Sequence, residues 1–131
     1  REGGPVTLAA CWAHLRRKFY ELHAAGLSET ASWTVGRMAA LWAIEQEIRG
    51  CDPDARRSAR QQAAAPIVAE LFERWEAELR RIPGKGKLAE AIRYALRRRE
   101  DLERFLDDGH IELDTNIVER AIRRKRPPLP V

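Results

Sequence analysis

The chain has 131 residues, 44% of them hydrophobic and 34% charged. A chain of this length can form one domain that buries roughly two thirds of the surface exposed in its unfolded state. The formal net charge of +4, from 24 Lys and Arg against 20 Asp and Glu, permits binding to a polyanion without requiring it. No apolar run approaches the roughly 20 residues that cross a bilayer, so no membrane-spanning helix is predicted. The two cysteines are far apart in the sequence, which predicts no disulfide framework and a reducing, cytoplasmic environment.

The N-terminal part is predicted to form one short strand followed by a helix. Val6 to Cys11 is a short, apolar and partly β-branched run, which is typical of a buried strand. A single strand cannot form a sheet, so its partner strands are expected outside this chain. The spacing then becomes helical as far as about Gly26, with these apolar positions: Trp12, Leu15, Phe19 and Leu22.

Three helices are predicted in the middle of the chain. The first begins after its N-cap Ser28 and ends near Arg49. The second begins near Asp54 and extends to Ile82, and Pro66 predicts a kink or a break within it. The third runs from about Leu88 to Asp107 and ends in a turn, Asp107 to His110. These elements form one helical body.

A last helix is predicted to begin at Asn116. Asn116 followed three residues later by Glu119 is a helix-start pattern, because each side chain can pair with an orphan backbone N–H group. Glu119 also precedes Arg123 by four residues, which favours a pair along the helix surface. The local pattern alone therefore favours a capped amphipathic helix, with this buried stripe: Val118, Ala121 and Ile122.

Cys11 and His14 lie three residues apart at the start of a predicted helix, a spacing that zinc ligands can have. A structural zinc site takes four ligands, and the sequence offers no second pair nearby. The spacing alone therefore favours a buried thiol and a hydrogen-bonded histidine over a metal site.

Basic clusters are candidates for contacts with phosphate groups. They are Arg16 to Lys18, Arg97 to Arg99, and Arg123 to Arg126. A charge run on an amphipathic helix is more often its solvated face, so this alternative stays open.

Asp114 and Glu119 are the candidate acids. Two carboxylates five residues apart do not face each other on a helix, so they cannot form a paired site by themselves. Glu119 can still be one ligand of a magnesium site, because two-metal phosphoryl-transfer sites collect carboxylates from distant parts of a chain.

Three segments of the chain resemble transposases of the insertion sequence 66 family. They are Cys11 to Phe19, Leu88 to Leu96, and Phe105 to Arg123, and they come in the family's order with similar spacing. The resemblance covers nearly the whole chain up to Arg123 and identifies it as a segment from the C-terminal half of such a transposase.

The resemblance implies a DDE transposase, in which two Asp and one Glu on a ribonuclease-H-like fold hold two magnesium ions for DNA strand cleavage and joining. The expected fold is mainly α: a helical, bundle-like insertion with one N-terminal strand left from the ribonuclease-H-like α/β domain. The expected regions are a remnant of that domain at 1–27, the helical insertion at 28–107, a turn and the Glu-bearing helix at 108–124, and a divergent tail at 125–131.

The same resemblance implies roles for individual residues. Glu119 matches the third acid and a magnesium ligand, and the two Asp are expected upstream of this chain. His14 matches a Cys-x-x-His signature near the active site of several DDE groups, with no assigned chemical role. The residues expected to contact the phosphates of transposon or target DNA are Arg16, Arg17, Lys18, Arg120 and Arg123.

The tail from Arg124 to Val131 departs from the family pattern, as a frameshifted or prematurely stopped copy would. With both catalytic Asp absent, we expect the isolated chain to be inactive. Its expected location is a bacterial cytoplasm. Two other functions are kept open. One is a free-standing helical module that binds DNA, with Glu119 only capping its helix. The other is a helical interaction protein that assembles with further proteins of the element or with copies of itself.

Overall fold

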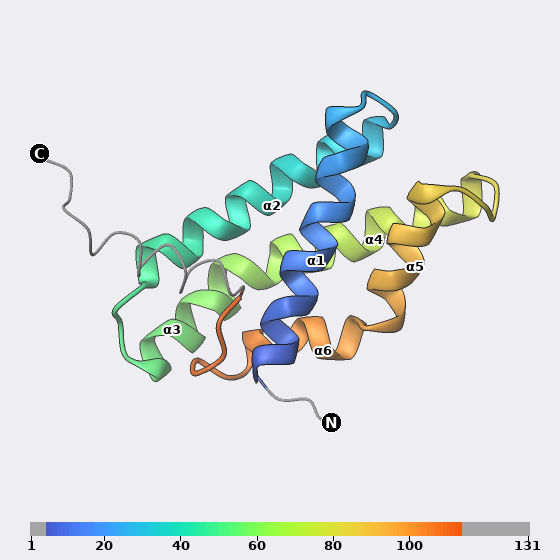
Figure 1. Ribbon diagram of the computed structural model, residues 1–131. Coiled ribbons are helices and arrows are strands. Elements are labelled where there is room, and N and C mark those ends of the chain that lie inside the picture. The colour runs from blue at the N-terminus through green and yellow to red at the C-terminus, as the bar shows by residue number, and fades with distance from the viewer. Residues whose placement is uncertain (1–4, 114–131) are drawn as a thin grey trace, which may run out of the picture.

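The computed structural model describes residues 5–113, and it describes their side chains from residue 11 onward. The described part is mainly helical and contains no strand. Six α-helices follow in chain order: α1 Pro5–Ala24, α2 Glu29–Ile48, α3 Pro53–Ala59, α4 Ala65–Arg81, α5 Lys87–Arg97 and α6 Arg99–Glu103. A π-helical turn, η1 Arg60–Ala64, joins α3 to α4, and a 3-10 turn, η2 Arg104–Leu106, follows α6. Figure 1 shows α1 crossing in front of α4, with α2 on one side of it and α5 on the other.

The mainly α prediction is confirmed, whereas the predicted strand at Val6 to Cys11 is wrong. These residues belong to α1, which begins at Pro5. A lone strand would leave its backbone N–H and C=O groups without partners, whereas a helix pairs them within the segment. Ala9 and Ala10 are also strong helix formers. The described residues therefore give no support to a ribonuclease-H-like strand in this chain.

The predicted start and end of α2 are confirmed. Ser28 is its N-cap, and the Ser28 hydroxyl accepts a hydrogen bond from the backbone N–H of Ala31 at 3.0 Å. The helix ends at Ile48, and Gly50 then adopts a left-handed conformation with φ of 92°. Such a conformation favours glycine, because other residues have a Cβ atom that clashes there.

The break predicted at Pro66 is present as the π-helical turn η1. Pro66 lies in the first turn of α4, where its missing N–H costs little. Just before α4, the backbone widens into the π-helical turn Arg60–Ala64. This wider turn accommodates the backbone carbonyl that would otherwise accept a hydrogen bond from an N–H group at position 66. This widened turn contains Arg60, the most deeply buried charged side chain of the described region.

The continuous helix predicted from Leu88 to Asp107 is wrong. The helix stops at Arg97, and Arg98 departs from helical geometry with φ of −110° and ψ of 20° before α6 begins. The bend lets the following segment fold under α1: the Trp12 indole N–H donates to the carbonyl of Leu102 at 2.8 Å, and Phe105 packs edge-on against Trp12. Tertiary packing of these residues therefore outweighs the local helical pattern.

Helices α1, α2, α4 and α5 share one hydrophobic core, which aromatic side chains dominate. Phe19 of α1 stacks on Trp75 of α4, with ring centroids 5.2 Å apart. The Trp75 indole N–H donates to the Thr34 hydroxyl at 3.0 Å, so this buried polar group is satisfied. No helix in the described region combines the length and the apolar character needed to span a membrane.

Candidate functional site

The outer side of α1 carries four of the predicted site residues. Because Trp12, Leu15 and Phe19 point into the core, the intervening residues lie at the surface. His14 and Arg17 are exposed, and Arg16 and Lys18 are half-buried. The Arg16 guanidinium lies over the Trp42 ring of α2, with its carbon 5.0 Å from the ring centroid. The three consecutive cations therefore point in different directions around the helix.

Lys18 and His14 meet Tyr94 of α5. The Lys18 ammonium lies 5.3 Å from the centroid of the Tyr94 ring, and the His14 ring centroid lies 5.4 Å from it. The Arg98 guanidinium carbon, at the C-terminal end of α5, lies 4.0 Å from the same centroid. We call the set of His14, Arg17, Lys18, Tyr94 and Arg98 the basic–aromatic surface.

The environment of Tyr94 changes its acidity. Partial burial, followed by interaction with the Cys11 thiol, raises the pKa of the Tyr94 hydroxyl, and the positive charge of Arg98 acts in the opposite direction. Tyr94 therefore stays a neutral phenol at physiological pH. Its ring can attract cations without adding a compensating negative charge.

The predicted Arg97 to Arg99 cluster is divided among different environments. Arg97 is exposed, and Arg98 stacks on Tyr94. Arg99 forms ion pairs with Glu76 at 3.1 Å and with Glu103 at 3.0 Å, and its guanidinium lies over the Phe72 ring. Arg99 thus ties α6 to α4 and is not a free cation.

The side chains of Cys11 and His14 do not face a common site. Cys11 is buried, whereas His14 is exposed. Among the residues that the structure describes, no group of three or more His, Cys, Asp and Glu side chains could hold a metal ion. This part of the chain therefore does not fit a metal site by itself.

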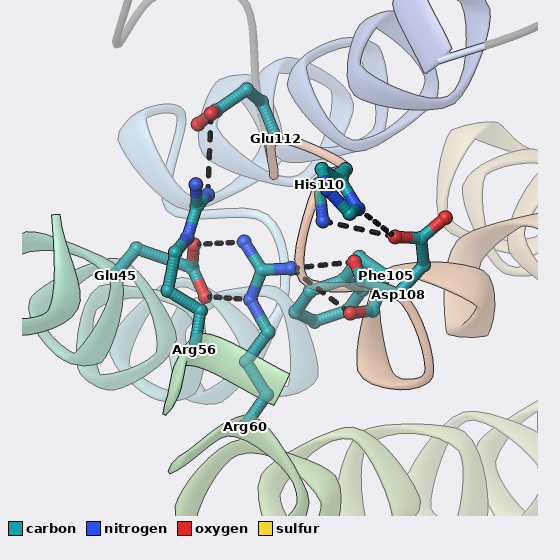
Figure 2. Close-up of polar contacts among 7 residues, drawn as sticks. All are labelled: Glu45, Arg56, Arg60, Phe105, Asp108, His110 and Glu112. Carbon is teal, nitrogen blue, oxygen red and sulfur yellow. Dashed lines mark hydrogen bonds and ion pairs between the residues drawn. The ribbon is translucent and has the colours of Figure 1, made fainter. Parts of the chain in front are cut away.

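A second assembly fixes the turn that precedes the Glu119 segment, and it is centred on Arg60 (Figure 2). Arg60 is 0% exposed and forms a two-pronged ion pair with Glu45, at 2.9 Å from Nε and 2.7 Å from Nη2. Its Nη1 donates to the carbonyls of Phe105 and Asp108 at 3.0 and 3.1 Å, and its guanidinium lies over the Phe105 ring. Arg60 therefore connects α2 to the backbone of the turn.

Further contacts hold the same segment, residues 107–113, which we call the anchored turn. Arg56 of α3 pairs with Glu112 at 3.2 Å. Arg57 Nε donates to the Asp107 carbonyl at 3.1 Å, and Gln61 donates to the Leu106 carbonyl at 3.2 Å. The segment ends in the core, because Leu113 is fully buried.

Gly109 of the anchored turn packs directly on the N-terminal end of α3. A Cβ atom added to Gly109 would lie 1.9 Å from the carbonyl oxygen of Pro53 and 2.6 Å from its carbonyl carbon. Only glycine permits this close approach of two backbones. Gly109 is therefore required by contact with α3.

Asp108 stabilises the turn from its exposed side. Its carboxylate accepts from the His110 backbone N–H at 2.9 Å and lies 3.1 Å from His110 Nδ1. The backbone hydrogen bond, followed by the side-chain contact, lowers the pKa of Asp108. Figure 2 shows this contact at the edge of the Arg60 assembly.

The lowered pKa of Asp108 predicts a pH-dependent contribution to stability. Because the pKa is lower in the folded state, the contribution is present above the unfolded pKa and is lost as pH falls through the folded pKa. Urea unfolding of wild type and Asp108→Asn should show a small loss of stability in the variant at pH 7 and a smaller loss at pH 3. An equal difference at both pH values would contradict a role for the carboxylate charge.

The remaining predicted site residues, Glu119, Arg120 and Arg123, lie outside the described residues, as does Asp114. Sequence reasoning missed Tyr94 and the Arg60 assembly. One signal was available: Glu45 lies three residues before Ile48 and four after Leu41, so it interrupts the apolar face of α2. An acid in that position requires a buried cationic partner.

Comparison with known proteins identifies the family of the chain. Residues 1–126 match the transposase IS66 family. Two similar proteins of Sinorhizobium fredii (strain NBRC 101917 / NGR234) are uncharacterized protein y4qI, 59% identical over 118 residues, and uncharacterized protein y4jD, 41% identical over 119 residues. The matches cover 90% and 91% of this chain but only 22% and 23% of those proteins, so the chain spans about a quarter of their length. No solved structure matches the chain. Since the family match covers nearly the whole sequence, the chain belongs to the transposase IS66 family.

Proposed function

We propose that the chain is the segment of a DDE transposase that supplies the third catalytic acid, Glu119, for metal-dependent cleavage and transfer of DNA strands. The observation that carries this proposal is the family match over residues 1–126, which includes Glu119. The function is in DNA transposition, and the partner is DNA at the transposon ends and at the target.

The anchored turn supports a positioning role for the helical body. Its last residue, Leu113, is buried in the core and precedes Glu119 by six residues. Arg56 and Arg60 fix the same segment from α3 and η1, through Glu112 and the Asp108 carbonyl. A catalytic acid requires such support, because a small displacement of a reacting group costs a large part of the rate.

A complete metal site would need acids from elsewhere in a longer protein. In the described region Glu45, Glu76 and Glu112 are committed to arginine partners. Bound magnesium would activate the attacking oxygen and stabilise the departing one. Glu119 would contribute one carboxylate to that site, together with two Asp that this chain lacks.

The isolated chain is therefore expected not to cleave DNA. Purified chain incubated with magnesium and a supercoiled plasmid that carries the DNA flanking this reading frame should leave the plasmid intact. The Glu119→Gln variant is the control for contamination, because a trace nuclease would nick the plasmid equally in preparations of wild type and of the variant. Nicking by wild type that is lost in Glu119→Gln would contradict the expected inactivity.

Transfer of the segment into a longer relative tests the role of Glu119. The matching part of y4qI is replaced by this chain, and excision of a marked element is counted in cells. If the unaltered relative and the chimera both excise the element, Glu119→Gln in the chimera should lower the frequency by at least about 100-fold, because it removes a metal-binding charge. An active Glu119→Gln chimera would refute the assignment of the third acid.

The basic–aromatic surface favours a second candidate function, a helical DNA-binding module in which Glu119 has no catalytic role. Arg17 and Lys18 are part of this surface and Arg16 lies beside them on α1, and contacts from these cations to phosphates would need no magnesium. DNA binding that depends on salt but not on magnesium or on Glu119→Gln, together with an active Glu119→Gln chimera, would favour the module over the transposase segment.

A further inference from the structure

We infer that the basic–aromatic surface binds the sugar-phosphate backbone of DNA, and that Tyr94 is the residue that organises it by holding Lys18 of α1 and Arg98, which follows α5. The inference rests on the proposed function only in taking DNA as the partner. It assigns a binding role to Tyr94, which no sequence pattern singled out, and it distinguishes Arg98 from its neighbours in the Arg97 to Arg99 cluster.

The cations of this surface are among those of the described region that have no carboxylate partner. Six arginines there pair with carboxylates; they are Arg37, Arg56, Arg60, Arg81, Arg99 and Arg104. Within residues 11–113, by contrast, no carboxylate pairs with Arg17, Lys18 or Arg98. Cations without protein counter-charges are the ones that release counterions when they neutralise phosphates.

Tyr94 gives this surface a defined geometry. The Arg98 guanidinium and the Lys18 ammonium lie 4.0 and 5.3 Å from the ring centroid, so one aromatic ring contacts a cation of α1 and the cation that follows α5. Cation–π contact reduces the freedom of two long side chains without neutralising their charge. Less conformational entropy is then lost when both cations contact phosphates.

The shape of the surface favours an extended polyanion over a small anionic ligand. One hollow beside the surface is open to solvent and is lined by Ala13, Arg16, Arg17 and Tyr20. Small ligands require a concave site that buries most of their surface. An exposed helix with cations along it instead suits a duplex backbone, which presents regularly spaced phosphates.

Acidic residues limit the footprint at one end. Glu21 of α1 and Glu90 of α5 line a hollow together with Lys18 and Lys87. These carboxylates would repel phosphates, so contact should be strongest from His14 to Lys18 and at the Arg98 end of α5. The inference therefore predicts that Lys87 contributes less to binding than Lys18.

Fluorescence anisotropy with a labelled 30-base-pair duplex tests the inference, in EDTA so that no metal contributes. Wild type and the Lys18→Gln/Arg98→Gln variant are titrated from 50 to 200 mM salt. Loss of two phosphate contacts should weaken binding on the order of 10- to 100-fold and reduce the salt slope by about 2. The matched control, Arg37→Gln/Arg104→Gln, removes the same charge from cations paired with Glu70 and Asp101. Equal weakening in the two double variants would overturn the inference, because only total charge would then matter.

Tyr94 is tested by two neutral substitutions. Tyr94→Phe keeps the ring and should bind DNA within about twofold of wild type, whereas Tyr94→Leu removes the ring and should weaken binding several-fold. Circular dichroism and thermal unfolding establish that each variant is folded, and a variant that fails to fold is replaced by Tyr94→Met. Wild-type affinity in a folded variant without the ring would overturn the role of Tyr94.

The partner class and the proposed function are tested separately. Tighter binding of poly-glutamate or of duplex RNA than of duplex DNA would overturn DNA as the partner. The inference places no binding role on Glu119. Failure of the Glu119 excision test would therefore leave the binding result standing, and loss of binding would leave the catalytic assignment standing.

Discussion

Replacement of Arg60 by methionine is expected to destabilise the fold by about 3–5 kcal/mol, the usual cost of removing one partner from a buried ion pair. Methionine replaces the aliphatic stem of arginine but not its guanidinium group, so lost packing against Phe105 contributes to the expected loss of stability. It leaves the Glu45 carboxylate, 3% exposed, without its cation, and it removes the donor to the carbonyls of Phe105 and Asp108. Urea unfolding at pH 7 measures the loss as a lower transition midpoint.

A matched control separates burial from the ion pair itself. Arg104 pairs with Asp101 at 3.0 Å, but both side chains are about half exposed. Arg104→Met should therefore cost less than about 1 kcal/mol, as exposed pairs do. Similar losses in Arg60→Met and Arg104→Met would contradict the central role of Arg60.

A double variant identifies the source of the Arg60 effect. Glu45→Met/Arg60→Met removes both charges, so it should recover part of the stability lost in Arg60→Met. Recovery should be incomplete, because the Phe105 and Asp108 carbonyls still lack a donor, at a cost of about 1–3 kcal/mol for a buried unpaired group. Full recovery would show that the turn does not depend on these two hydrogen bonds.

The helical elements were predictable because local signals and packing agree in them. Ser28 caps α2 as its sequence implies, and the apolar positions of α1 from Trp12 to Leu22 are buried. Prediction failed where contacts distant in sequence decide the structure. The bend at Arg98 brings Leu102 under Trp12, 90 residues away in sequence, and no local pattern contains that information.

The candidate site was predictable in composition but not in geometry. Arg16, Arg17 and Lys18 were identified as a cluster, yet one lies on Trp42, one faces solvent and one lies on Tyr94. Each helical residue turns by about 100°, so neighbours in sequence point apart. Arg60 is not identified from the sequence, because no local pattern shows that the π-helical turn places it against Glu45.

Replacement of Gly109 by alanine is expected to detach the anchored turn from α3. The new Cβ atom would lie 1.9 Å from the Pro53 carbonyl oxygen, and backbone atoms cannot yield as a flexible side chain does. The turn must therefore move, which should weaken the hydrogen bonds from Arg60 to Phe105 and Asp108 and cost at least about 3 kcal/mol, the upper end for overpacking. Hydrogen exchange should show faster exchange at Ile111, whose N–H donates within the turn to the Asp108 carbonyl at 3.2 Å.

Gly36 provides the matched control for this substitution. It lies inside α2, and a Cβ atom built there meets nothing within 4 Å. Gly36→Ala should therefore stabilise the protein by roughly 0.5–1 kcal/mol, because alanine loses less backbone freedom in a helix than glycine does. The same chemical change thus has opposite expected signs at the two positions. A neutral or stabilising effect of Gly109→Ala would show that the anchored turn can separate from α3 at no cost in stability. A turn that separates so easily could not hold Glu119 in place.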